Sequence, residues 1–146
     1  MDQKELDKIV AEHKKWLEDS STGKRADLQW ANLRNAYLLW ADLLWADLQW
    51  ADLQWADLRF ANFQNATLQW ADLWYADLWY ADLRYADLMN TDLRHSKLYK
   101  TYVSIKSTKI YLSFKPVTSY QVYTEQQQVD LINDLLEHVY MCKVTE

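Results

Sequence analysis

The chain has 146 residues, enough for one domain, and a formal net charge of -5. This acidic balance argues against a basic nucleic-acid footprint and against attraction to anionic lipid, so we expect neither direct nucleic-acid binding nor a membrane partner. The single cysteine, Cys142, allows no internal disulfide and fits a reducing compartment. No apolar run approaches the roughly 20 residues of a membrane span, and the N-terminus lacks the apolar core of a signal peptide. We therefore expect a cytoplasmic protein.

The first segment, residues 3–18, has apolar side chains at spacings of three and four, which predicts an amphipathic helix that ends before Gly23. Its apolar face carries Leu6, Ile9, Val10, His13, Trp16 and Leu17. We expect this face to pack on the open end of the segment that follows, so that residues 1–24 form an N-terminal helical cap. The pair His13 and Trp16 is interpreted as part of this packing and not as a binding patch.

Residues 25–103 follow a repeat with a period of five. Every fifth residue from Leu28 to Leu98 is Leu, except Phe63, and the residue two places earlier is Ala as far as Ala86. On a helix, successive leucines would turn by about 140° and form no single apolar stripe, and in a flat strand an odd spacing sends them to opposite faces. The remaining solution is a chain that turns a corner in each repeat, with Leu and Ala on a common axis. This is a solenoid.

Fifteen repeats built on the motif A-[D/N]-L-x-x, with departures such as Phe63, Thr91 and Ser96, follow one another over residues 26–100. This array resembles the pentapeptide-repeat family. The resemblance covers about half of the chain. It implies an all-β solenoid, a right-handed quadrilateral β-helix with four repeats, and therefore twenty residues, in each coil. Residues 25–103 would then make about four coils.

The repeat pattern decays in residues 104–146. Residues 110–114 and 119–123 are β-prone and flank Lys115 and Pro116, which predicts an irregular β segment. Residues 125–143 carry apolar side chains at helical spacing, which predicts a C-terminal helix. This helix would cap the last coil or pair with its copy in a homodimer.

The sequence offers no catalytic constellation, and we expect neither an enzyme nor a cofactor. The three histidines lie in separate segments, and no nucleophile motif or glycine-rich phosphate loop is present. His95 and Asp92 have no third ligand at a useful spacing, so no metal site is expected.

The outward positions are rich in aromatic residues, with nine Trp in the chain. A twenty-residue period aligns Trp30, Trp50 and Trp70 in one column and Gln29, Gln49 and Gln69 in the column beside it. These six residues are the candidate interaction face, because exposed Trp is common at binding hot spots. The alternative is that stacked rings only reinforce the contact between coils. The rings fall on all four sides, which favours this reinforcement over a dedicated binding face.

A second outward column holds acidic side chains. Asp52, Asp72 and Asp92 would stack on one side as a candidate acidic face. Some pentapeptide-repeat proteins imitate DNA and engage type II topoisomerases, which is one alternative for the function, although interspersed arginines weaken it. The other reading is that these aspartates bond to nearby backbone, as Asx residues do in turns. The sequence thus favours a non-enzymatic scaffold or interaction module with an unidentified protein partner. The uniform interior is also typical of a designed or consensus solenoid without a ligand.

Overall fold

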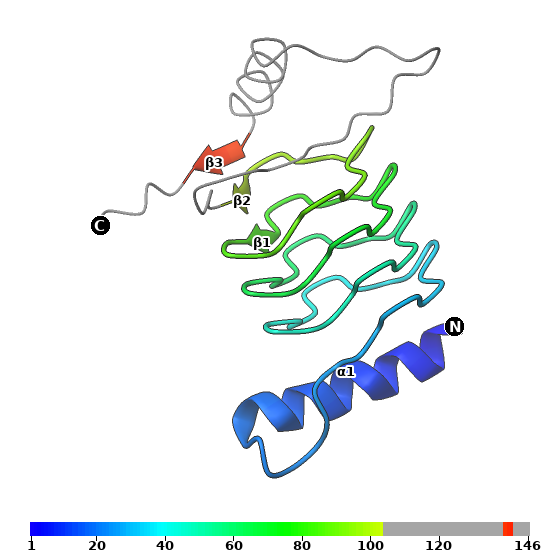
Figure 1. The fold of residues 1–146 in the computed structure, drawn as a ribbon, viewed down its shortest axis with the longest axis vertical. Coiled ribbons are helices and arrows are strands. Elements are labelled where there is room, and N and C mark those ends of the chain that lie inside the picture. Colours follow the sequence, from blue (N-terminus) through cyan, green and yellow to red (C-terminus); the bar gives the residue numbers. More distant parts are fainter. Residues whose placement is uncertain (104–138, 142–146) are drawn as a thin grey trace.

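The computed structural model describes residues 1–103 and 139–141. Helix α1 (Gln3–Glu18) lies across one end of a stack of coils, and the chain winds away from it coil by coil (Figure 1). At the far end, the short strands β1 (Asp82–Leu83), β2 (Thr101–Val103) and β3 (Val139–Met141) form a parallel sheet in the order β1-β2-β3. The predicted solenoid is confirmed.

The N-terminal segment forms the helix that the sequence predicts, with the same bounds. The carboxylate of Asp2 caps it by accepting the Glu5 N–H at 2.8 Å. After the helix, Gly23 adopts a φ of 62°, and a Cβ on this residue would lie 2.2 Å from the Glu12 carbonyl oxygen. Only glycine fits this close approach, which returns the chain to the first coil.

The coils stack with a register of twenty residues. Isolated parallel bridges join the second residue of a repeat to the residue twenty positions later, as in Asp52 with Asp72 and Asp72 with Asp92. Between bridges the Leu N–H groups point to the next coil, and the Leu53 N–H donates to the Asp72 carbonyl at 2.7 Å. One coil therefore contains four five-residue repeats, as the resemblance implies.

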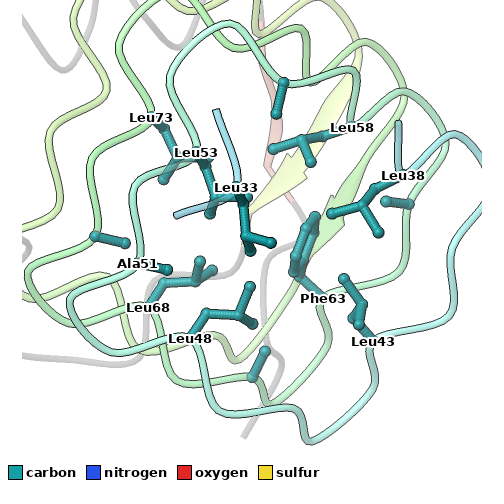
Figure 2. Close-up of a cluster of buried hydrophobic side chains, with 14 of the residues drawn as sticks. Leu33, Leu38, Leu43, Leu48, Ala51, Leu53, Leu58, Phe63, Leu68 and Leu73 are labelled. Atoms are coloured by element: carbon teal, nitrogen blue, oxygen red, sulfur yellow. The ribbon is translucent and has the colours of Figure 1, made fainter. Parts of the chain in front are cut away.

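The interior of the solenoid is a column of Leu and Ala. Figure 2 shows Leu33, Leu53 and Leu73 close together on one side of the interior, with Leu48 and Leu68 on another. From Leu43 to Leu83, the side chains at every fifth position, which are all Leu except Phe63, are at most 1% exposed. Burial of these side chains is the main driving force for the stack, at about 1.5–3 kcal/mol for each.

Each repeat closes with a turn whose last residue has a positive φ, between 54° and 65°. In the first repeat the Ala31 N–H donates to the Leu28 carbonyl at 3.1 Å across such a turn. This left-handed conformation is costly for residues other than Gly, Asn and Asp, yet most of these positions hold rings. Sequence reasoning missed this feature. Asn35, Asn65 and Asn90 at the same position were the available signal, because Asn tolerates the left-handed region.

The predicted C-terminal helix over residues 125–143 is wrong at its end. Val139–Met141 form strand β3, which pairs in parallel with β2. The last coil offers an open sheet edge, and β3 covers this edge by pairing with β2. The remaining parts of that prediction, and the irregular β segment before it, lie outside the described residues.

Candidate functional site

Three tryptophans form a continuous stack along one corner of the solenoid, which we call the Trp corner (Trp30, Trp50 and Trp70). Ring centroids are 4.9 Å apart between Trp30 and Trp50 and 4.8 Å apart between Trp50 and Trp70, and the planes of each pair differ by 1°. The side chains stay open to solvent, with Trp30 68%, Trp50 42% and Trp70 47% exposed. The structure thus places the predicted column together, and it is both stacked and exposed.

The neighbouring glutamine side chains do not line up beside the rings as a second exposed column. The amide of Gln49 donates to both carboxylate oxygens of Asp47, at 3.1 and 3.2 Å, and that of Gln69 donates to Asp87 at 2.6 Å. These glutamines are therefore engaged with the side of the coil that precedes the Trp corner. They contribute less to a common surface with the rings than the sequence suggests.

The predicted acidic face, here called the acid column (Asp52, Asp72 and Asp92), is partnered throughout. Arg34 lies 3.4 Å from Asp52, the Gln54 amide donates to Asp72 at 2.6 Å, and Arg94 forms a salt bridge of 2.5 Å with Asp92.

Each carboxylate also closes an Asx turn. Asp52 accepts the Gln54 N–H at 3.2 Å, and Asp72 accepts the Trp74 N–H at 3.0 Å. This agrees with the reading that the aspartates bond to nearby backbone. At the end of the column, the side-chain hydrogen bond to Asp92 raises the pKa of Arg94 above its usual value.

The Trp corner and the acid column lie next to each other. Trp50 and Asp52 flank the buried Ala51, and Trp70 and Asp72 flank the buried Ala71, so ring and carboxylate point outward from adjacent positions in each coil. We call the combined surface the Trp–Asp face. Both faces of the Trp50 ring are covered by its stacked neighbours, so the middle of this surface offers ring edges and carboxylates.

Rings also stack at two other corners. Trp40, Phe60 and Tyr80 form one stack, with centroid distances of 4.0 and 5.0 Å. A further stack contains Trp55, Tyr75 and His95, with distances of 4.2 and 4.8 Å. His95 is thus part of an aromatic stack. Within residues 1–103 and 139–141, no group of three His, Cys, Asp or Glu side chains is placed to hold a metal ion.

The fourth corner is different, because Asn65 lies between Trp45 and Tyr85 in the twenty-residue register. We call these three residues the Asn65 corner. Asn65 adopts the same left-handed conformation as the rings, with a φ of 54°.

His13 closes the start of the first coil. Its Nδ1 accepts the Ala26 N–H at 3.0 Å, which requires the proton on Nε2, and Nε2 donates to the Leu44 carbonyl at 3.1 Å. The ring is buried, and burial lowers its pKa below the usual value of 6.5. The contacts agree with the prediction that His13 packs on the first coil.

In the described part of the chain, no helix combines the length and apolar character that crossing a membrane requires.

Several solved structures are similar to this chain. HetL, a pentapeptide repeat protein involved in heterocyst differentiation regulation in the cyanobacterium Nostoc sp. strain PCC 7120, is 35% identical, with a TM-score of 0.40. The match covers 53% of this chain and 40% of HetL, so the chain spans less than half the length of that relative.

A second pentapeptide repeat protein of Nostoc PCC 7120 is 32% identical over 65% of this chain and 78% of its own, with a TM-score of 0.34. A pentapeptide repeat protein of the Arabidopsis thaliana thylakoid lumen is 22% identical over 75% of this chain and 77% of its own, with a TM-score of 0.33.

A comparison with curated protein sequences gives no match. The family model for pentapeptide repeats matches eight copies over residues 24–59 and 61–98, which is just over half of the chain. The matched residues are those whose Leu and Ala side chains build the interior and whose aspartates close the turns. The chain therefore belongs to the pentapeptide repeat family.

Proposed function

We propose that the chain is a non-enzymatic interaction module and that the Trp–Asp face binds its protein partner. The observation that carries this proposal is the coexistence of stacking and exposure at the Trp corner, where the three residues are between 42% and 68% exposed. In this proposal the solenoid is a right-handed, four-sided β-helix of about four coils, and α1 is its N-terminal cap.

Preorganisation supports the proposal. The N–H of Trp50 donates to the Gln69 carbonyl at 3.0 Å, so the backbone under each ring is held by the next coil. The ring itself is held between two neighbours in parallel planes. A partner would therefore bind without the cost of ordering these side chains, which is about 0.5–1.5 kcal/mol for each flexible side chain.

The acid column predicts that the partner's binding surface is positively charged. Asp52 and Asp72 lie beside the rings, and Asp72 is paired with the neutral Gln54, so its charge is not compensated by that contact. We expect the partner to present an apolar patch with Lys or Arg at its rim, because complementary charge guides association.

The same contacts weaken the alternative of a DNA mimic. A mimic of the phosphate backbone needs a column of uncompensated negative charge, whereas Arg34 and Arg94 pair with two of the three carboxylates in the acid column. The topoisomerase alternative therefore has less support than a protein partner bound through the rings.

The test compares two matched pairs of substitutions in a pull-down from bacterial lysate. Trp50→Asn with Trp70→Asn removes two rings from the Trp corner, and Trp45→Asn with Trp55→Asn removes two rings from other corners. All four positions have a positive φ, which Asn tolerates, so both pairs should keep the fold by circular dichroism.

We expect the unchanged chain and the Trp45, Trp55 pair to retain the same partner, identified by mass spectrometry, and the Trp50, Trp70 pair to lose it. Equal retention by both pairs would contradict the proposed binding face. Loss of the fold in the Trp50, Trp70 pair alone would assign these rings to stacking.

A further inference from the structure

A groove lies between α1 and the first coil. It has a volume of about 450 Å³. Helix α1 contributes one wall, and the first coil contributes the other from Tyr37 to Asp42. The helix residues that line it are Asp7, Val10, Ala11 and Lys14.

The coil wall of this groove is an open sheet edge. One coil further along, the Asn62 N–H donates to the Ala41 carbonyl at 2.9 Å, and the Asn62 carbonyl accepts the Leu43 N–H at 2.8 Å. Asp42 occupies the place of Asn62 in the first coil, where no preceding coil exists. Among the described residues, three backbone groups of this edge have no hydrogen-bond partner. They are the N–H of Asp42, the carbonyl of Asp42 and the carbonyl of Leu39.

Helix α1 satisfies other groups of the same edge with its side chains. The Gln3 side-chain amide donates to the Tyr37 carbonyl at 2.9 Å and accepts the Tyr37 N–H at 2.9 Å. His13 Nε2 donates to the Leu44 carbonyl at 3.1 Å. The unpaired groups thus lie between these two contacts, in the stretch that lines the groove. A ligand that pairs with them must itself present backbone N–H and C=O groups, which is the chemistry of an extended peptide.

The aromatic stack at this corner ends in the groove. One face of the Trp40 ring stacks on Phe60, while the side chain is 66% exposed and lines the groove. At the other end of the same stack, the Lys100 ammonium lies 5.3 Å from the centre of the Tyr80 ring, so a cation covers that end.

The charges around Trp40 favour a cation at this end too. Asp7 and Asp42 line the groove against one Lys14, so carboxylates are in excess. A guanidinium can stack on a Trp face and pair with a carboxylate at the same time.

We propose that this groove binds an extended peptide segment that carries an arginine, added as a parallel strand below the first coil. The ladder above fixes the register. The arginine N–H donates to the Leu39 carbonyl, the carbonyl of the next peptide residue accepts the Asp42 N–H, and the N–H two residues further on donates to the Asp42 carbonyl. The guanidinium then lies under Trp40 and beside Asp42.

Isothermal titration calorimetry of the full chain with short peptides tests this proposal. The probe is acetyl-Leu-Arg-Ala-Thr-Leu-amide. Two control peptides carry Glu in place of Arg, or an N-methyl group on the last Leu, which blocks the bond to the Asp42 carbonyl. We expect each control to bind about tenfold more weakly or not at all. Equal binding of the Arg and Glu peptides would overturn the proposal, and so would equal binding of the N-methylated peptide.

Matched substitutions place the peptide in the groove. Ala11→Trp fills the groove from α1, whereas Lys8→Trp puts the same ring on an exposed position of the helix that does not line it. We expect the Ala11 variant to lose the Arg peptide and the Lys8 variant to bind it as the unchanged chain does, with equal helix content by circular dichroism.

Asp42→Asn removes the negative charge of this side chain. The Leu44 N–H, which donates to the Asp42 carboxylate at 3.3 Å, can donate to the amide oxygen of Asn in the variant. Binding of the Arg peptide should weaken several-fold, while the gap to the Glu peptide narrows. Binding unchanged in both the Ala11 and Asp42 variants would overturn the site. A peptide with Phe in place of Arg that binds more tightly than the probe would overturn the assignment of arginine.

Discussion

The Trp corner and the Asn65 corner have the same backbone and different side chains. Trp50 has a φ of 61° and donates its N–H to the next coil at 3.0 Å, while Asn65 has a φ of 54° and donates at 3.1 Å. The Trp corner fills every place with a stacked ring as far as Trp70, whereas Asn65 separates Trp45 from Tyr85. A solenoid corner therefore closes equally well without a ring in this place.

The energies at the two corners lead to the same conclusion. A residue other than Gly or Asn loses about 1–2 kcal/mol in the left-handed conformation. Two stacked neighbours return about 0.5–1.5 kcal/mol each. For Trp50 these contributions are of similar size, so stacking largely offsets the strain of placing Trp where Asn would fit. The rings of the Trp corner thus contribute little to the free energy of folding, which supports a role in binding at the surface.

The largest effect should come from the side of the coil that joins the two corners. Leu48 lies on this side and is fully buried, so Leu48→Ala leaves a cavity under both corners. We expect a loss of about 2–5 kcal/mol in the free energy of unfolding, measured by urea denaturation. A loss below about 1 kcal/mol would mean that the interior column does not dominate the stability of the stack.

The next effect separates the two corners. Trp50→Asn removes two stacked contacts, whereas Trp45→Asn removes none with Asn65. Since both substitutions relieve the same backbone strain, we expect Trp50→Asn to cost about 1–3 kcal/mol more than Trp45→Asn. The measurement is the difference between the urea midpoints of the two variants, provided that the dependence of the unfolding free energy on urea concentration is the same for both. Equal costs would show that the parallel rings contribute no stacking energy.

Converting the Asn65 corner into a second full stack should have a smaller effect. Asn65→Trp adds two ring contacts, to Trp45 and Tyr85, and adds the strain of a ring at positive φ. We expect a net change within about 1 kcal/mol in thermal unfolding, because the two contributions oppose each other. Partner binding in the pull-down should stay the same, since the new stack lies on another corner. A gain in binding would contradict a role specific to the Trp corner.

The smallest effect should come from His13, which connects α1 to the first coil. The lowered pKa of His13 means that the folded chain holds this ring neutral at pH values where the unfolded chain is partly protonated. The contribution of His13 to stability is therefore present above about pH 6.5 and is lost as the pH falls through the lower folded pKa.

Thermal unfolding between pH 7.5 and pH 5 measures this loss. His13→Gln removes the titrating group and should flatten the dependence over that range. An unchanged slope in the variant would assign the pH dependence to other groups. Asp19 and Asp57 also have lowered pKa values, but they titrate below their usual 3.8 and lie outside this window.

Periodicity made the interior of this fold predictable. The five-residue spacing of Leu excludes helix and flat strand, and the twenty-residue register then places Trp30, Trp50 and Trp70 in one column. The helix bounds followed from local spacing, since residues 3–18 contain the whole amphipathic pattern.

What depends on contacts between distant segments could not be predicted. Spacing does not reveal that Gln3 reaches the backbone of Tyr37, thirty-four residues away. Nor does it show that Val139–Met141 covers an open strand edge, because apolar residues at helical spacing favour a helix until a partner strand is known. The pairing of Arg34 with Asp52 likewise depends on the stacking of two coils.

We propose that the Trp corner binds the partner and that the Asn65 corner contributes to the fold alone. Hydroxyl-radical footprinting of the unchanged chain, free and bound to the partner recovered in the pull-down, tests it without any substitution. We expect lower oxidation of Trp30, Trp50 and Trp70 in the complex, with Trp45 unchanged. Protection of Trp45 alone, or no protection at the Trp corner, would contradict it.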